Sequence, residues 1–146
     1  MFETLNRITL SGVELPIKCD LIVLEKIQDR YESISDFEKL IYRFTPQLDK
    51  DGNPVIRDGA MIGTVATPPS LRALGDGLVW MVQEGVVIAN DGGEKIPAYT
   101  PEQIKRLVDV PPYELSELVH EEFLRAFERK NSMTPQTQAG ETETMS

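Results

Sequence analysis

Few of the residues that build disulfides, metal sites or membrane spans occur in this sequence. Its 146 residues include one cysteine, Cys19, and one histidine, His120. A lone cysteine excludes an internal disulfide, and one cysteine with one histidine falls short of the usual ligands of a structural zinc site. No apolar run approaches the ~20 residues of a membrane-spanning helix, and residues 1–5 lack the features of a secretion signal. The sequence therefore predicts an intracellular protein with no bound metal and no membrane contact.

Positive charge is also scarce. The chain has 15 Lys and Arg against 24 Asp and Glu, which gives a net charge of −9, and its basic residues form no cluster. Binding to nucleic acid or to anionic lipid requires concentrated positive charge. We therefore expect no nucleic-acid partner and no anionic membrane partner.

Motifs for catalysis and nucleotide binding are incomplete or missing. The string Gly75-Asp76-Gly77 lacks the third glycine and the preceding strand of a dinucleotide-binding motif. Residues 49–53 resemble the start of a calcium loop, but Pro54 replaces the required glycine and Ala60 the bidentate glutamate, which favours a simple turn. Since no group of residues indicates an active site, we expect no enzymatic activity and no cofactor.

Three polar features have simpler interpretations than catalysis. Cys19 lies away from any cationic cluster that would lower its pKa, which favours a small buried apolar side chain. His120 is interpreted as a partly exposed helix residue rather than a metal ligand. The pair Glu121-Glu122 is interpreted as charge on a solvated helix face rather than as an acid and base pair.

The N-terminal pattern predicts a hairpin and then a helix. Over residues 6–18, apolar and polar side chains alternate on both sides of Ser11-Gly12, which is typical of two antiparallel strands. From Asp20, a suitable helix cap, the apolar period changes to three and four residues. This change predicts a helix that continues to about Tyr31.

A second helix and a long loop are predicted next. A capping box at residues 35–38 indicates a helix start, and the helix should end near Thr45 because Pro46 disfavours helical geometry in the preceding residue. Residues 45–69 are loop-like, with a strong turn at residues 51–54. Short strand partners are expected within this loop at three apolar positions, Leu48, Val55 and Ile56.

The most apolar helix is expected over residues 71–83, capped by Ser70, and it should form the buried centre of the fold. Gly75 and Gly77 would each weaken this helix by ~1 kcal/mol relative to alanine, which close packing against a neighbour would explain. From Gly85 onward the sequence leaves open whether the helix ends, continues or gives way to a short strand.

Two further helices complete the predicted domain. Thr100 and Gln103 form a capping box for one of them, and the last, over residues 113–130, has its apolar side chains on one face. Residues 131–146 lack a usable apolar pattern and are predicted to form a disordered acidic tail. We therefore expect a single, mainly α-helical domain over residues 1–130 with a small N-terminal β-hairpin, in the α+β class.

A series of short strings occurs in a characteristic order along the chain. The strings are residues 8–17, Leu24-Glu25-Lys26-Ile27, residues 80–90, residues 94–97, Thr100-Pro101-Glu102-Gln103 and Tyr113-Glu114-Leu115. Their order resembles that of tail assembly chaperones from long-tailed phages and prophages of Gram-positive bacteria. The resemblance covers roughly residues 6–130, and residues 45–69 have no counterpart in it.

The resemblance implies a non-catalytic assembly factor in the cytoplasm of the host cell. Such chaperones bind the tape measure protein, keep it soluble and help to recruit tail tube subunits, and they are not expected in the mature virion. An acidic helical protein with an apolar stripe suits this role, because it can cover apolar helix surface while its charge maintains solubility. Alternatives are a small structural tail completion or connector protein retained in the particle, and a host adaptor unrelated to phage.

The last helix is predicted to carry the partner-binding surface, through Leu118, Phe123 and Phe127. An amphipathic terminal helix next to a flexible tail is the element least committed to the core. Core packing is the competing interpretation for Phe123 and Phe127. Because the same apolar stripe can pair with a second copy, self-association is a further expectation.

Overall fold

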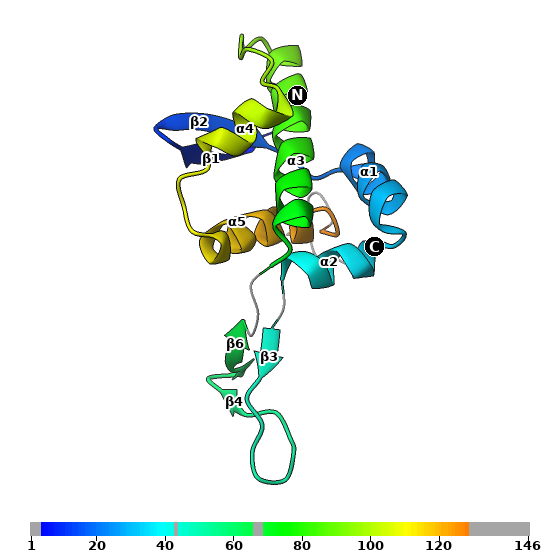
Figure 1. The fold of residues 1–146 in the computed structure, drawn as a ribbon, viewed down its shortest axis with the longest axis vertical. Coiled ribbons are helices and arrows are strands. Elements are labelled where there is room, and N and C mark those ends of the chain that lie inside the picture. The colour runs from blue at the N-terminus through cyan, green and yellow to red at the C-terminus, as the bar shows by residue number, and fades with distance from the viewer. Residues whose placement is uncertain (1–3, 43, 66–68, 129–146) are drawn as a thin grey trace, which may run out of the picture.

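The computed structural model describes residues 4–42, 44–65 and 69–128. Within these ranges the chain forms five helices and six short strands (Figure 1). The helices are α1 (Leu21–Tyr31), α2 (Ile34–Ile41), α3 (Leu71–Asp91), α4 (Pro101–Leu107) and α5 (Pro112–Arg125). The strands are β1 (Asn6–Leu10), β2 (Val13–Ile17), β3 (Phe44–Pro46), β4 (Ile56–Arg57), β5 (Ala60–Met61) and β6 (Gly63–Val65). The expected class, mainly helical with an N-terminal hairpin, is confirmed.

The N-terminal hairpin has the predicted position and turn. Strands β1 and β2 pair antiparallel with Ile8 opposite Leu15, and the turn at Ser11-Gly12 has positive φ angles. Leu10 and Leu15 are fully buried. The apolar face of the hairpin therefore belongs to the main core.

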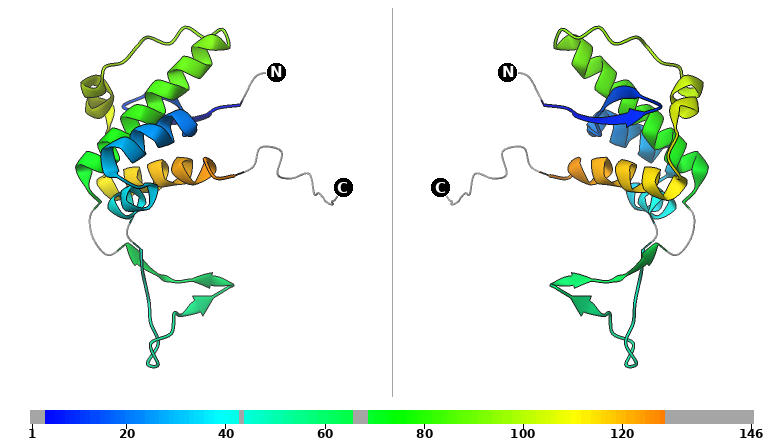
Figure 2. Two further views of the ribbon diagram at one scale, coloured as in Figure 1. Left: turned by 90° about the vertical axis from the view of Figure 1, so that its right-hand side faces the viewer. Right: turned by 90° about the vertical axis from the view of Figure 1, so that its left-hand side faces the viewer.

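Strand β2 and the residue after it contact the backbone of α3 directly (Figure 2). The backbone N–H of Lys18 donates to the carbonyl oxygen of Met81 at 3.0 Å. One helical turn further on, a Cβ added to Gly85 would lie 2.3 Å from the carbonyl oxygen of Pro16. Glycine at this position is what allows the strand to approach the helix so closely.

Helix α3 is longer than the predicted residues 71–83. It continues through Gly85 to Asp91, because Val86 and Ala89 have buried positions on the same packed face. In the last turn of α3, the side chain of Asn90 donates to the carbonyl of Ile96 at 2.9 Å and accepts from its N–H at 2.8 Å. These two bonds hold the chain reversal that leads to α4.

Three predicted helix caps are confirmed. The Asp20 carboxylate accepts from the N–H of Val23 at 3.2 Å, and the Ser70 hydroxyl accepts from the N–H of Ala73 at 3.3 Å. Thr100 forms both hydrogen bonds of its capping box. The start of each of these helices is therefore determined by local sequence.

The predicted bounds of the second helix are wrong at both ends. Its cap is Ser33, whose hydroxyl accepts from the N–H of Asp36 at 2.9 Å, and residue 35 already lies inside the helix. The helix ends at Ile41 rather than near Thr45, because Tyr42 adopts an extended conformation. Strand β3 begins at Phe44 and pairs with β6, so the chain is extended where the sequence predicts the end of the helix.

Helix α5 also ends earlier than predicted, at Arg125 instead of about residue 130. The following residues form tighter turns, in which the N–H of Phe127 donates to the carbonyl of Leu124 at 3.1 Å. The predicted tail over residues 131–146 lies outside the described residues.

Residues 44–65 form a small β-arm that extends from the helical body (Figures 1 and 2). In it β3 pairs with β6, β4 pairs with β5, and Leu48 bridges Pro54. The Asp49 carboxylate accepts from the N–H groups of Asp51 and Asn53, so the turn predicted for this segment is present. Leu48 and Ile56 take part in strand pairing as expected, although both side chains are exposed. Val55 lies outside the strands, and its backbone exchanges hydrogen bonds with Gln47 and Ile62.

The main core lies between the hairpin and the helices, around α3. Its largest fully buried apolar side chains are Phe37, Phe123, Leu10, Leu15, Ile27, Ile41, Leu74, Leu78, Met81, Ile104 and Val23. In the part of the chain that the structure describes, no helix combines the length and hydropathy that crossing a bilayer requires.

Candidate apolar groove on the central helix

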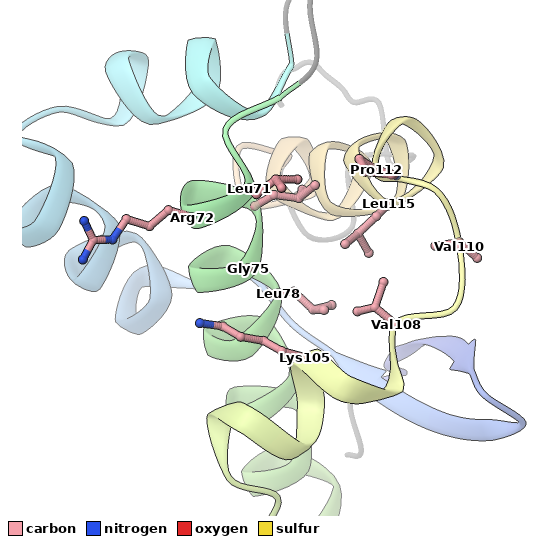
Figure 3. Close-up of a pocket in the computed structure, with 10 residues that line it drawn as sticks. Leu71, Arg72, Gly75, Leu78, Lys105, Val108, Val110, Pro112 and Leu115 are labelled. Atoms are coloured by element: carbon pink, nitrogen blue, oxygen red, sulfur yellow. The ribbon is translucent and has the colours of Figure 1, made fainter.

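An apolar cavity of about 460 Å³ opens beside the first turns of α3 (Figure 3). Its lining comes from α3, from the end of α4, from the segment between α4 and α5, and from the start of α5. The lining residues are Leu71, Arg72, Leu74, Gly75, Leu78, Lys105, Val108, Val110, Pro112 and Leu115. This volume lies within the ~300–1,000 Å³ typical of ligand-binding pockets. We name this site the α3 groove.

Buried residues of two helices form the floor of the α3 groove. Leu74, Leu78 and Leu115 are each at most 6% exposed and belong to the main core. Leu71, in the first turn of α3, is 66% exposed and stands at the rim. The groove therefore continues the core outward, with an apolar side chain left in solvent at its edge.

The wall opposite α3 is a short extended segment. Val108 and Val110 are partly buried there, and Pro112 begins α5. Pro111 and Pro112 disfavour helical geometry in the residues that precede them, so this segment stays extended along the groove. The Ser11 hydroxyl of the hairpin donates to the carbonyl of Leu107 at 2.7 Å and holds this wall in place.

The two basic residues of the lining leave the apolar part of the groove uncharged. Figure 3 shows that the charged ends of Arg72 and Lys105 point away from the converging leucine and valine side chains. The aliphatic part of Lys105 passes over Gly75, where an added Cβ would lie 3.2 Å from Lys105 Cε. The groove can therefore bind apolar groups without desolvating a charge.

The residues predicted to bind a partner do not share one surface. Phe123 is 2% exposed and contacts Phe37 in the core, with ring centroids 5.8 Å apart. Leu118 is partly buried, whereas Phe127 is 58% exposed. Leu118 lies within α5, whereas Phe127 follows the end of the helix at Arg125. Of the three, Phe127 is therefore the one that a partner can reach directly.

His120 and Cys19 occupy structural positions. The His120 ring stacks on Tyr42 with centroids 4.1 Å apart, and its Nε2 lies 2.8 Å from the carboxylate of Glu38. Cys19 is 2% exposed, and burial raises the pKa of its thiol to about 12. The interpretation of Cys19 as a small buried side chain is confirmed.

Glu122 was expected on a solvated helix face, and that expectation is wrong. It is 2% exposed, and its carboxylate accepts from Asn6 Nδ2 at 3.2 Å, Cys19 N–H at 3.3 Å and Arg125 Nη1 at 2.7 Å. Its neighbour Glu121 is exposed. Because the hairpin and the start of α1 pack against α5 here, one glutamate of the pair lies in the core and the other in solvent.

The sequence provides only a weak signal for the α3 groove. Leu71 follows the helical apolar pattern, so it is assigned to the buried face. Val108 and Val110 lie in a short segment with no clear periodicity. Whether these side chains meet or leave a cavity depends on the angle between α3 and α5, which local sequence does not specify.

Two carboxyl groups meet where α1 begins beside α3. A hydrogen bond between Glu84 and Asp20, together with burial and the nearby negative charge, raises the pKa of Glu84 to about 7 from an ordinary value of 4.5. Folding therefore favours proton uptake by Glu84. This pair makes stability depend on pH in a defined direction.

Replacing Glu84 with glutamine should stabilise the protein near pH 8 and change little near pH 4. In the parent, the folded-state penalty is absent below pH 4.5, grows as pH rises towards 7, and is complete above that value. Allowing for partial exposure of Glu84, we expect a gain of about 1 kcal/mol. Urea denaturation of the parent and of Glu84→Gln between pH 4 and pH 8 measures this gain in stability. An equal gain at pH 4 and at pH 8 would show that the pKa of Glu84 is not raised.

Within the described ranges, no three His, Cys, Asp or Glu side chains lie together as a metal site requires. Comparisons with protein-family models, with curated proteins and with solved structures found no match to this chain.

Proposed function

We propose that this protein is a phage or prophage tail assembly chaperone that binds apolar helical surface of the tape measure protein. The observation that carries the proposal is the α3 groove, an open apolar site with a leucine at its rim. The order of sequence strings that resembles this chaperone family supports it independently.

The groove fits a helical ligand in its size and chemistry. A helix presents apolar side chains three and four residues apart, and proteins commonly bind such a helix by placing those side chains in an apolar groove. The floor is made of core leucines, so it is already ordered before binding. Little conformational entropy is therefore lost by the receptor on association.

A chaperone of this kind would act in the host cytoplasm, help to recruit tail tube protein to the bound tape measure protein, and be released before the virion matures. Its net charge of −9 would keep an otherwise aggregation-prone complex in solution. Self-association in the absence of the partner would protect the same apolar surface.

Replacing Leu71 with glutamate should abolish binding of the tape measure protein and leave the fold intact. Leu71 is 66% exposed, so its substitution disturbs no core contact, but the charge would stand at the rim of the groove. Ile22→Glu is the matched control, since Ile22 is 51% exposed at the start of α1 and lies outside the groove lining. We expect more than about tenfold weaker capture for Leu71→Glu and less than about twofold for the control.

The measurement is co-expression with the tape measure protein of the same gene cluster, followed by affinity capture and a solubility assay. Soluble tape measure protein that co-purifies with the parent and the Ile22→Glu control, but not with Leu71→Glu, supports the proposal. Failure of the parent to solubilise or capture it contradicts the proposal. Stoichiometric recovery of this chain in purified particles would instead favour a structural tail completion or connector protein.

A further inference from the structure

We propose that the outer face of α5 is a second docking surface, which binds a basic amphipathic helix. Four glutamates form a line along this face: Glu114, Glu117, Glu121 and Glu128. Glu114, Glu117 and Glu121 are spaced by three and four residues, so they project from one side of α5. Glu128 follows the end of the helix and is also exposed. We call this line the α5 acidic stripe.

Apolar side chains border the α5 acidic stripe. Tyr113 is 48% exposed, Leu124 45% and Phe127 58%. Tyr113 and Leu124 are eleven residues apart, close to three full turns, and therefore lie on the same side of α5. Phe127 continues this side beyond the helix end, where its ring packs against Phe123 with centroids 5.3 Å apart. The outer face thus combines a negative line with an adjacent apolar line.

The position of α5 leaves this face free of other described elements. The opposite face of the helix is buried, through Leu115, Val119 and Phe123. Figure 2 shows α5 along the side of the helical body from which the β-arm extends. The glutamates of the stripe are exposed, and Glu121 forms a single long ion pair with Arg125, at 3.6 Å.

Charge complementarity specifies the occupant. A partner helix with Lys or Arg beside its apolar side chains can pair with the stripe while it covers Leu124 and Phe127. A second copy of this chain would bring four glutamates against four, and the like charges would repel. An anionic membrane is disfavoured for the same reason. The surface is distinct from the α3 groove, whose lining carries no acidic residue.

The test uses two synthetic amphipathic peptides of equal length, one built of Leu and Lys and the other of Leu and Glu. Binding of each to the full chain is followed by fluorescence anisotropy. We expect the Leu/Lys peptide to bind and the Leu/Glu peptide not to bind. The affinity of the Leu/Lys peptide should fall at least about tenfold between low salt and about 0.3 M salt, because the contacts are ionic.

Glu117→Gln/Glu121→Gln is the variant that isolates the stripe, and Glu25→Gln/Asp29→Asn is its control. Glu25 and Asp29 are exposed on α1 with the same four-residue spacing, so both variants change the net charge equally. We expect the stripe variant to bind the Leu/Lys peptide about fivefold more weakly and the control to bind it within about twofold of the parent. Circular dichroism establishes that both variants fold.

A substitution in the apolar line provides a second readout. Phe127→Asp, at an exposed position, adds a negative charge to the protein, so charge alone would strengthen binding of the Leu/Lys peptide. Because the substitution removes an apolar contact, we expect it to weaken binding severalfold instead. Equal binding of the peptide by the stripe variant and the control, or unchanged binding by Phe127→Asp, would overturn the proposal. Because the probes are synthetic peptides, these outcomes do not depend on whether the tape measure protein binds the α3 groove.

Discussion

Replacing Gly85 with alanine should destabilise the protein by more than ~3 kcal/mol, a large share of the ~5–15 kcal/mol by which a typical domain is stable. The new Cβ would lie 2.3 Å from the carbonyl oxygen of Pro16 and 2.5 Å from its carbonyl carbon. These are backbone atoms of β2, so no side-chain rotation relieves the overlap. The hairpin would have to move away from α3, which breaks the hydrogen bond from Lys18 to Met81 as well.

Gly75, another glycine of α3, separates the effect of steric overlap on stability from the effect of helix propensity. At Gly75 an added Cβ would meet only the flexible end of Lys105, with the nearest atom 3.2 Å away. Alanine is intrinsically better than glycine in a helix by ~1 kcal/mol. Gly75→Ala should therefore be neutral or stabilising, whereas Gly85→Ala is strongly destabilising.

Urea denaturation followed by circular dichroism measures both glycine variants. Gly77→Ala should fall between them, since its Cβ would lie 2.9 Å from Phe37 Cζ, a side-chain atom that can shift. Similar stabilities for Gly85→Ala and Gly75→Ala would show that β2 does not pack on the backbone of α3 as described.

Replacing Glu122 with leucine should cost about 2–4 kcal/mol of stability. The substitution leaves the backbone N–H of Cys19 and the side chain of Asn6 without their buried acceptor. It also leaves Arg125, whose side chain is 35% exposed, without its 2.7 Å partner. The hairpin, the start of α1 and the end of α5 would lose the polar group that connects them.

The adjacent glutamate is the control for this effect. Glu121 has a side chain that is 66% exposed and pairs with Arg125 at 3.6 Å, so Glu121→Gln should change stability by less than about 0.5 kcal/mol. Thermal or urea denaturation of the two variants under the same conditions measures their changes in stability relative to the parent. If Glu122→Leu were as stable as Glu121→Gln, the buried contacts of Glu122 would contribute no net stability.

The local elements of the fold could be predicted from the sequence because their causes are local. The turn at Ser11-Gly12 and the caps at Asp20, Ser70 and Thr100 depend on hydrogen bonds within a few residues, and all are present in the structure. The hairpin and the helices follow from apolar periods of two and of three to four residues.

Element ends were less predictable when a neighbour in space decided them. The second helix ends at Ile41 because the chain turns into the β-arm. Helix α3 continues through Gly85 because Val86 and Ala89 are buried on its packed face, and Pro16 lies against Gly85. A glycine inside an apolar stretch is compatible with both a helix end and a close packing contact. Nothing within a few residues of Gly85 distinguishes the two.

The sequence by itself determined the secondary-structure class, the principal caps and the central apolar helix, because hydrogen bonds and periodicity act over short separations. Only the tertiary structure decided that Glu122 is buried while Glu121 is exposed, that Phe123 lies in the core while Phe127 lies in solvent, and that a groove opens beside Leu71. Each of these outcomes depends on how helices and strands distant in sequence pack against one another, and side-chain burial is a property of that packing rather than of the local pattern.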